Sequence, residues 1–183
     1  AGEVFKEGTY EIESERRGYA LELAVDFVRM EYTRPRFWEK DDTPVVPLKS
    51  QTLEDVIETW PQGKINVRIG DYMFRPHQKW TITAVPDGGG YLGGPYYKIV
   101  IEGTNRALAA TADAEVVTVP EFTGAPEQLW RIDQLTDGTY RIMPKEVPGT
   151  DKELVLASVG DSTPSLGEFD MNSDNSKWNF RDH

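Results

Sequence analysis

The sequence predicts an all-β protein built from three similar units, and three observations lead to this prediction. Short segments rich in Val, Ile, Tyr, Thr and Trp follow one another at intervals of roughly ten residues, with turn residues between them. A tyrosine motif and a tryptophan motif each occur three times along the chain. Apolar and polar residues alternate within the segments, as they do in strands with one buried face, whereas helical periodicity is almost absent.

The tyrosine motif begins the chain's first predicted strand. The sequence "EGTYEI" at 7–12 returns as "DGTYRI" at 137–142, and a weaker copy, "GGPYYKI", stands at 93–99. Gly, Thr, Tyr and Ile occupy the same places in the first two copies. Such internal repetition indicates a fold assembled from repeated structural units.

The tryptophan motif follows each tyrosine motif. It reads Gln78-Lys79-Trp80, then Gln128-Leu129-Trp130, then Ser176-Lys177-Trp178. The pairs of motifs divide a single domain, residues 1–183, into units at about 7–85, 89–135 and 136–183, the first with about thirty extra residues. Four strands in each unit give twelve strands, and three units related by a pseudo-threefold axis can close a barrel that no unit could close alone.

These motifs give each repeated position a predicted structural role. The three tryptophans are expected in the core, and the residues two positions before them, Gln78, Gln128 and Ser176, are expected to hold nearby turns by hydrogen bonds. The arrangement resembles the β-trefoil family over essentially the whole chain, and the Gln-x-Trp repeats resemble its ricin-B-like branch. The resemblance implies a β-trefoil of twelve strands with an enlarged first repeat.

The extra residues of the first unit carry the remaining structural predictions. Residues 50–60 read "SQTLEDVIETW", where Thr52 and Asp55 resemble a capping box and predict a short helix or turn. Phe37, Trp38 and Trp60 are predicted to pack this segment onto the barrel, with an exposed anchor for a partner protein as the alternative.

Composition excludes several classes of function. A net charge of −11 would repel nucleic acid and anionic membranes, and no apolar run exceeds five residues, so neither nucleic-acid binding nor membrane insertion is expected. Cysteine is absent, which excludes disulfides and thiol chemistry. The missing cysteines, and the lack of a positively charged segment before an apolar one at the amino end, favour the cytosol.

Catalysis is also not expected. The chain has two histidines, His77 beside the first tryptophan motif and His183 at the last position, and the first is predicted to be structural. No pair of carboxylates has a distinctive spacing, and no cofactor or metal is predicted. The segment 170–176 begins like a calcium loop but lacks its glycine and its final acid, so a polar turn is predicted there.

Carbohydrate binding is one of two functions that the resemblance implies. Ricin-B-like modules hold a sugar with an aspartate early in the repeat, an aromatic platform and a later Asn or Gln. At the matching places this chain has the segments 21–23, 108–110 and 154–156, none with an aspartate. Glu22 could take that role, with Gln78 and Gln128 as the later amides, although glutamate is one methylene longer.

Protease inhibition is the other implied function, and it is placed ahead of carbohydrate binding. The segment 7–12 is similar to the first strand of the mushroom trefoil inhibitors, the mycocypins and related fungal defence proteins, and 41–48 is similar to a Pro-Val-rich segment of that family. A rigid loop in the cleft of a cysteine or serine protease would lose little entropy on binding. The loop residues predicted to contact the protease are Arg16, Arg17, Gly18, Tyr19, Arg34, Pro35, Arg36 and Asn105.

Each protease class would need a different loop residue. Gly18 and Tyr19 match the loop that mycocypins insert into cysteine proteases. An exposed arginine would enter a trypsin-like pocket, and Pro35 would stiffen the loop around Arg34 and Arg36. Asn105 would suit an asparagine-specific protease. In either function, recognition is expected in loops that differ between the units.

Overall fold

A computed structural model describes residues 5–16, 18–25, 57, 60–91, 94–159, 163–170 and 172–182 of the 183-residue chain. Several predictions lie outside this described part of the chain. They concern Arg17, Arg34, Pro35, Arg36, Phe37, Trp38, the segment 41–48 and nearly all of the helix expected at 50–60.

The described residues form twelve strands, as predicted, in three sets of four. The first set comprises β1 (Gly8–Ser14), β2 (Ala20–Leu23), β3 (Ile65–Gly70) and β4 (Trp80–Tyr91). The second comprises β5 (Gly94–Ile101), β6 (Ala107–Ala110), β7 (Val116–Val119) and β8 (Trp130–Gln134). The third comprises β9 (Tyr140–Pro144), β10 (Val155–Val159), β11 (Thr163–Gly167) and β12 (Trp178–Asp182).

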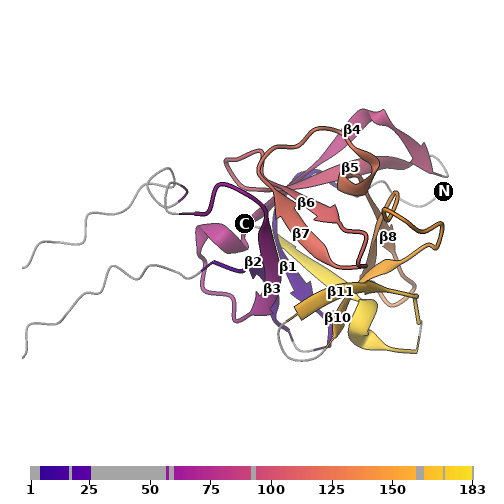
Figure 1. Cartoon of the computed structure of the whole chain (residues 1–183). Coiled ribbons are helices and arrows are strands. Elements are labelled where there is room, and N and C mark those ends of the chain that lie inside the picture. The colour runs from indigo at the N-terminus through magenta and orange to yellow at the C-terminus, as the bar shows by residue number, and fades with distance from the viewer. Residues whose placement is uncertain are drawn as a thin grey trace, which may run out of the picture.

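Six of these strands close a barrel. The order β12-β9-β8-β5-β4-β1 is continuous, and β1 pairs with β12 to complete the ring. Closure removes the exposed edges that an open sheet would leave. The remaining six strands form three hairpins, β2–β3, β6–β7 and β10–β11, one from each set, arranged around the barrel (Figure 1). This is the β-trefoil architecture that the motifs predicted.

The tyrosine and tryptophan motifs meet in space, which explains why they recur together. Tyr10 is the strand partner of Trp80, Tyr97 of Trp130 and Tyr140 of Trp178. All three tryptophans are fully buried, as predicted.

Each buried indole also makes the same hydrogen bond. Trp80, Trp130 and Trp178 donate their Nε1–H to the carbonyl oxygens of Leu21, Leu108 and Leu156, at 2.8, 2.8 and 2.9 Å. Because a buried indole N–H without a partner would be costly, these bonds fix where the hairpin strand of each unit crosses its tryptophan.

The indole bonds correct the sequence alignment of the third unit. Sequence comparison placed 154–156 opposite 21–23, which would make Val155 the counterpart of Glu22. The bonded carbonyls instead equate Leu21, Leu108 and Leu156, so the counterparts of Glu22 are Ala109 and Ala157. The apolar run 154–157 is buried at every position, so side-chain pattern could not reveal the two-residue difference.

The same bonds measure the enlargement of the first unit. Leucine and tryptophan are separated by 59 residues in the first unit and by 22 in each of the others, a difference of 59 − 22 = 37. At the end of this extra segment Trp60 is 8% exposed and belongs to the main core cluster, together with the barrel residues. Trp60 therefore packs into the core and is not an exposed anchor, as predicted.

Phe5 closes one end of the barrel. Its ring contacts Tyr10, Tyr97, Tyr140 and Phe180 with centroid distances of 4.7 to 5.7 Å, so it touches the motif tyrosine of every unit. The backbone beside it is held as well, because the hydroxyl of Tyr97 donates to the Phe5 carbonyl at 3.0 Å. Edge-to-face and tilted aromatic contacts of this kind add to the free energy gained from burial.

Replacing Phe5 by alanine is expected to lower the free energy of unfolding by about 2 to 3 kcal/mol, because it removes a packed ring and leaves a cavity among the tyrosines. Denaturant unfolding followed by tryptophan fluorescence measures the change. Phe74→Ala is the matched control, since Phe74 is 69% exposed, and it should change stability by less than about 0.5 kcal/mol. Equal effects of the two substitutions would show that Phe5 does not close the barrel.

Candidate functional site

A buried polar cluster surrounds Glu22, the predicted substitute for the family's sugar-binding aspartate. Glu22 lies on β2 and is 4% exposed. Its Oε1 accepts from the Gln78 side-chain amide at 2.9 Å, and its Oε2 accepts from Arg68 Nε at 2.8 Å. His77 Nε2 lies 3.3 Å from the same Oε2. Strand β3 supplies the arginine and the short 3-10 helix η1 (Pro76–Gln78) supplies the other two partners.

The cluster keeps the Glu22 carboxylate ionised. Burial alone would raise its pKa, but hydrogen bonds from His77, Arg68 and Gln78 outweigh burial, and the pKa lies below its ordinary value. The prediction that His77 is structural agrees with its position, because its side chain is buried against this carboxylate.

The space in front of Glu22 is narrow. A Cβ placed on Gly70 would stand 2.8 Å from Glu22 Oε1, so β3 passes directly over the carboxylate. Three protein groups already bind the two oxygens. One acceptor position on Oε1 is left, and it lies on the side where β3 crosses at Gly70, so a sugar would find little room beside this carboxylate. At the equivalent positions of the other units, Ala109 and Ala157 carry no polar group.

Gln78 and Gln128 hold turns, as predicted. Gln78 Oε1 accepts from the backbone N–H of Met73, and Gln128 Oε1 from that of Thr123, both at 2.8 Å and both five residues upstream. Gln78 also donates to the carbonyl of Asp71 at 2.7 Å. These bonds assign both glutamines a structural role.

The turn held by Gln78 carries an exposed aromatic group for which the sequence pattern predicted no role. Met73 and Phe74 are 53% and 69% exposed, and the Phe74 ring lies 4.7 Å from that of Tyr72. Phe74 has a φ of +58°, a conformation unusual for a bulky residue. Burial, together with the charges of Glu11 and Glu102, raises the pKa of Tyr72 to about 12.

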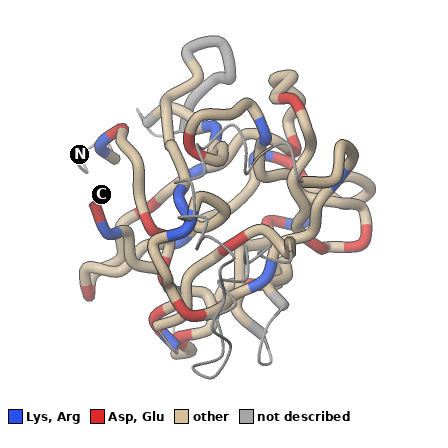
Figure 2. Tube along the Cα trace, turned by 90° about the vertical axis from the view of Figure 1, so that its left-hand side faces the viewer, with Lys and Arg blue, Asp and Glu red and all other residues tan. Residues whose placement is uncertain are grey.

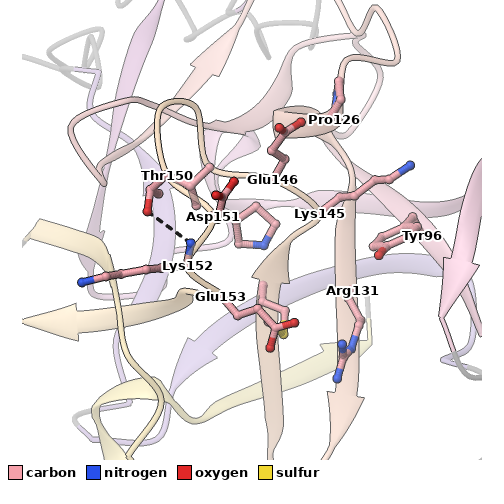
Figure 3. Close-up of a pocket in the computed structure, with 12 residues that line it drawn as sticks. Tyr96, Pro126, Arg131, Lys145, Glu146, Thr150, Asp151, Lys152 and Glu153 are labelled. Atoms are coloured by element: carbon pink, nitrogen blue, oxygen red, sulfur yellow. Dashed lines mark hydrogen bonds between the residues drawn. The ribbon is translucent and has the colours of Figure 1, made fainter.

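A cavity of about 380 Å³ lies between the second and third units (Figure 3). We call it the Tyr96 cavity. The 3-10 helix η2 (Pro126–Gln128) contributes Pro126 to its wall, β5 contributes Tyr96, and the loop between β9 and β10 contributes residues 145–153 except Pro148 and Gly149. The sequence predicted no binding role for these residues, because their side chains come from strands and loops far apart in the chain.

Aromatic and charged groups line the Tyr96 cavity together. Lys145 Nζ lies 5.2 Å from the centroid of the Tyr96 ring, and Figure 3 shows the two side by side, with Asp151, Lys152 and Glu153 on the loop across from them. The charged residues of the lining are three bases and three acids, namely Arg131, Lys145, Lys152, Glu146, Asp151 and Glu153. The cavity is thus polar and electrically balanced.

A second cavity, of about 600 Å³, is lined by Trp60 and Pro61 from the first unit and by Asn105, Pro120 and Glu121 from the second, among others. Asn105 is exposed, and its side-chain amide donates to Glu121 Oε2 at 3.3 Å. Asn105 therefore lies on the surface, as its predicted contact with a protease requires, but its side chain is held by a neighbour.

The remaining predicted protease contacts lie on the turn between β1 and β2. Arg16 is partly buried and donates to the Ser158 carbonyl at 3.3 Å, which ties it to the third unit. Gly18 is exposed with a φ of +72°, and Tyr19 packs against the core. The turn is thus well anchored.

The described residues carry mixed charges and offer no metal site. In Figure 2 the basic residues are interspersed with acidic ones along the described chain, without a broad basic region in that view. Among the described residues, no three His, Asp or Glu side chains are placed to hold a metal ion. The described part of the chain also includes no helix long and apolar enough to cross a membrane.

Residues 76–158, somewhat under half of the chain, match a family model described as "Ricin-type beta-trefoil lectin domain-like". The matched span contains both Gln-x-Trp motifs and every residue that lines the Tyr96 cavity. No curated protein matches the chain.

Solved structures share the fold at low sequence identity. A mosquitocidal holotoxin superimposes with a TM-score of 0.65 at 14% identity, covering 98% of this chain and 18% of the toxin. A Polyporus squamosus lectin bound to Neu5Acα2-6Galβ1-4GlcNAc gives 0.62 at 15% identity, covering 98% of this chain and 50% of the lectin. The β-trefoil lectin of the Vibrio vulnificus hemolysin/cytolysin, bound to N-acetyl-D-lactosamine, gives 0.57 at 12% identity, covering 96% and 95%.

Proposed function

We propose that this β-trefoil binds carbohydrate without chemical turnover. The observation that carries the proposal is the match of residues 76–158 to a lectin domain-like family, on a chain whose described fold is a complete trefoil. The two lectin structures above support it, since both contain a ligand with the unit Galβ1-4GlcNAc.

The physical properties of the surface are compatible with this function. The described chain offers cavities that combine aromatic side chains with both hydrogen-bond donors and acceptors. A sugar needs such a combination, because its hydroxyls are donors and acceptors while its C–H groups contact an aromatic face. The overall charge of −11 disfavours binding to polyanions and has little effect on a neutral sugar.

A glycan array tests the proposal. The purified chain is labelled with a fluorophore at its N-terminal amino group. It is expected to bind a subset of the immobilised glycans, and those that contain N-acetyl-D-lactosamine are the first to inspect. Binding should be abolished by the same soluble sugar in excess. An array without reproducible signal at micromolar protein would rule the proposal out.

Protease inhibition, placed first on the sequence alone, remains a prediction that neither the family match nor these structures support. A panel of papain-like, legumain-like and trypsin-like proteases, run beside the array, decides between the two. Stoichiometric slowing of any of these proteases, together with a blank array, would favour protease inhibition over carbohydrate binding.

A further inference from the structure

We propose that the Tyr96 cavity is the sugar-binding site of this protein and that it takes a neutral saccharide of one or two rings. The inference rests on the proposed function and assigns it to a place that the three repeats do not share. Three features of the cavity carry it: its position, its rigidity and the chemistry of its lining.

The position of the cavity is distinctive because the equivalent places in the other two units lack its aromatic ring and its lysine. Strand pairing equates Tyr97 with Tyr10 and Tyr140, so Tyr96 corresponds to Thr9 and Thr139. One unit of the three therefore has an aromatic ring at this point.

Lys145, the cation beside the Tyr96 ring, has no basic counterpart in the other two units. The backbone N–H of Lys145 donates to the carbonyl of Leu129, and the same bond in the other units is made by Glu102 and Glu15. The structural position thus recurs three times, while the pair of an aromatic ring and a lysine occurs at one of them. Such divergence within a repeated scaffold shows that the fold does not require this pair, and binding residues are often placed on variable loops that a rigid scaffold positions.

The loop that forms the cavity is fixed before any ligand arrives. Lys145 is tied to Leu129 at 2.8 Å, and Val147 pairs with Thr150 across a turn in which Gly149 has a φ of +82°. Val147, 3% exposed, anchors the turn in the core. The backbone N–H of Lys152 donates to the Thr150 hydroxyl at 3.2 Å. A preformed loop loses little conformational entropy on binding.

The lining fits a neutral polyhydroxylated ligand. Lys145 Nζ lies over the Tyr96 ring at 5.2 Å, and the remaining ring carbons that line the cavity supply an apolar surface for sugar C–H groups. Asp151 and Glu153 can accept from hydroxyls, while Lys145 and Lys152 can donate to them. Because acids and bases in the lining are equal in number, a phosphate or nucleotide would find no excess of positive charge. The volume of about 380 Å³ is within the usual range for small-ligand sites.

The test compares variants with the wild-type chain on one glycan array that includes N-acetyl-D-lactosamine and other neutral mono- and disaccharides. Tyr96→Ala should weaken the strongest neutral-glycan signal about tenfold or more, because it removes the aromatic contact. The double variant Asp151→Asn, Glu153→Gln, both at exposed positions, should weaken it by a similar factor and keeps the test valid if Tyr96→Ala misfolds. Phe74→Ala and Glu168→Gln, an exposed aromatic and an exposed acid outside the lining, should leave it unchanged.

Each other outcome has a defined meaning. Signal that persists in both cavity variants would overturn the cavity as the site while leaving carbohydrate binding intact. A blank array with the wild-type chain would overturn the proposed function and this inference together. Displacement of the protein from the array by millimolar inorganic phosphate would overturn the assignment to a neutral ligand.

Discussion

Replacing Trp130 by alanine is expected to lower the free energy of unfolding by about 4 kcal/mol. The indole is fully buried, so its removal leaves a large cavity in a closed barrel that cannot collapse around it. The substitution also leaves the carbonyl of Leu108 without the donor that binds it at 2.8 Å. Urea unfolding followed by circular dichroism measures the loss.

Two further variants make this prediction specific to the repeat. Trp130→Phe retains a ring but not the N–H donor, and it should cost less than half as much as Trp130→Ala. Trp178→Ala should cost about as much as Trp130→Ala, because the two indoles share their burial and their hydrogen bond. A loss below about 1 kcal/mol for either alanine variant would contradict the role of the tryptophans as equivalent core residues.

Glu22→Gln is expected to destabilise the protein by about 2 kcal/mol at pH 7, the usual size for hydrogen bonds to a buried charge. Glutamine is similar in shape, but it lacks the charge that Arg68 and His77 face at 2.8 and 3.3 Å. The substitution therefore tests electrostatics with little change in packing.

The destabilisation should depend on pH in a defined direction. The pKa of Glu22 is lower in the folded protein than in the unfolded chain, where glutamate titrates near about 4.3. Its contribution is thus complete above the unfolded pKa and is lost as the pH falls through the folded pKa.

Thermal unfolding of both proteins between pH 7 and pH 2.5 tests this dependence. The difference in Tm between wild type and Glu22→Gln should be constant down to about pH 5 and shrink below about pH 4. Glu168→Gln, at an exposed position, should follow wild type throughout. A difference that stays constant down to pH 2.5 would show that the Glu22 charge does not stabilise the fold.

The sequence predicted the fold well because each repeated motif has a single structural role. Tyrosine and tryptophan recur together since they are strand partners, as Tyr10 and Trp80 show. Turn-holding by Gln78 and Gln128 followed from the same motif. The alignment of the third unit was wrong by two residues, because 154–157 is buried throughout and its alternation gave no register.

The candidate site could be predicted only in part. The resemblance named Glu22 and Gln78 as sugar-binding candidates, but the hydrogen bond between them and the engagement of the carboxylate by Arg68 and His77 depend on how β2, β3 and η1 meet. The Tyr96 cavity could not be predicted at all. Its lining joins β5, η2 and the loop after β9, and local patterns in the sequence do not report which distant side chains face one another.

Backbone amide shifts would show where a bound sugar lies on the trefoil. The ¹⁵N-labelled chain is titrated with N-acetyl-D-lactosamine, or with the neutral glycan that gives the strongest array signal, and its backbone amide shifts are recorded. We expect the changes to concentrate at Tyr96 and residues 145–153. Changes concentrated instead at Glu22, Arg68 and His77, or spectra that do not change at millimolar sugar, would contradict the claim that this trefoil binds a neutral saccharide between its second and third repeats.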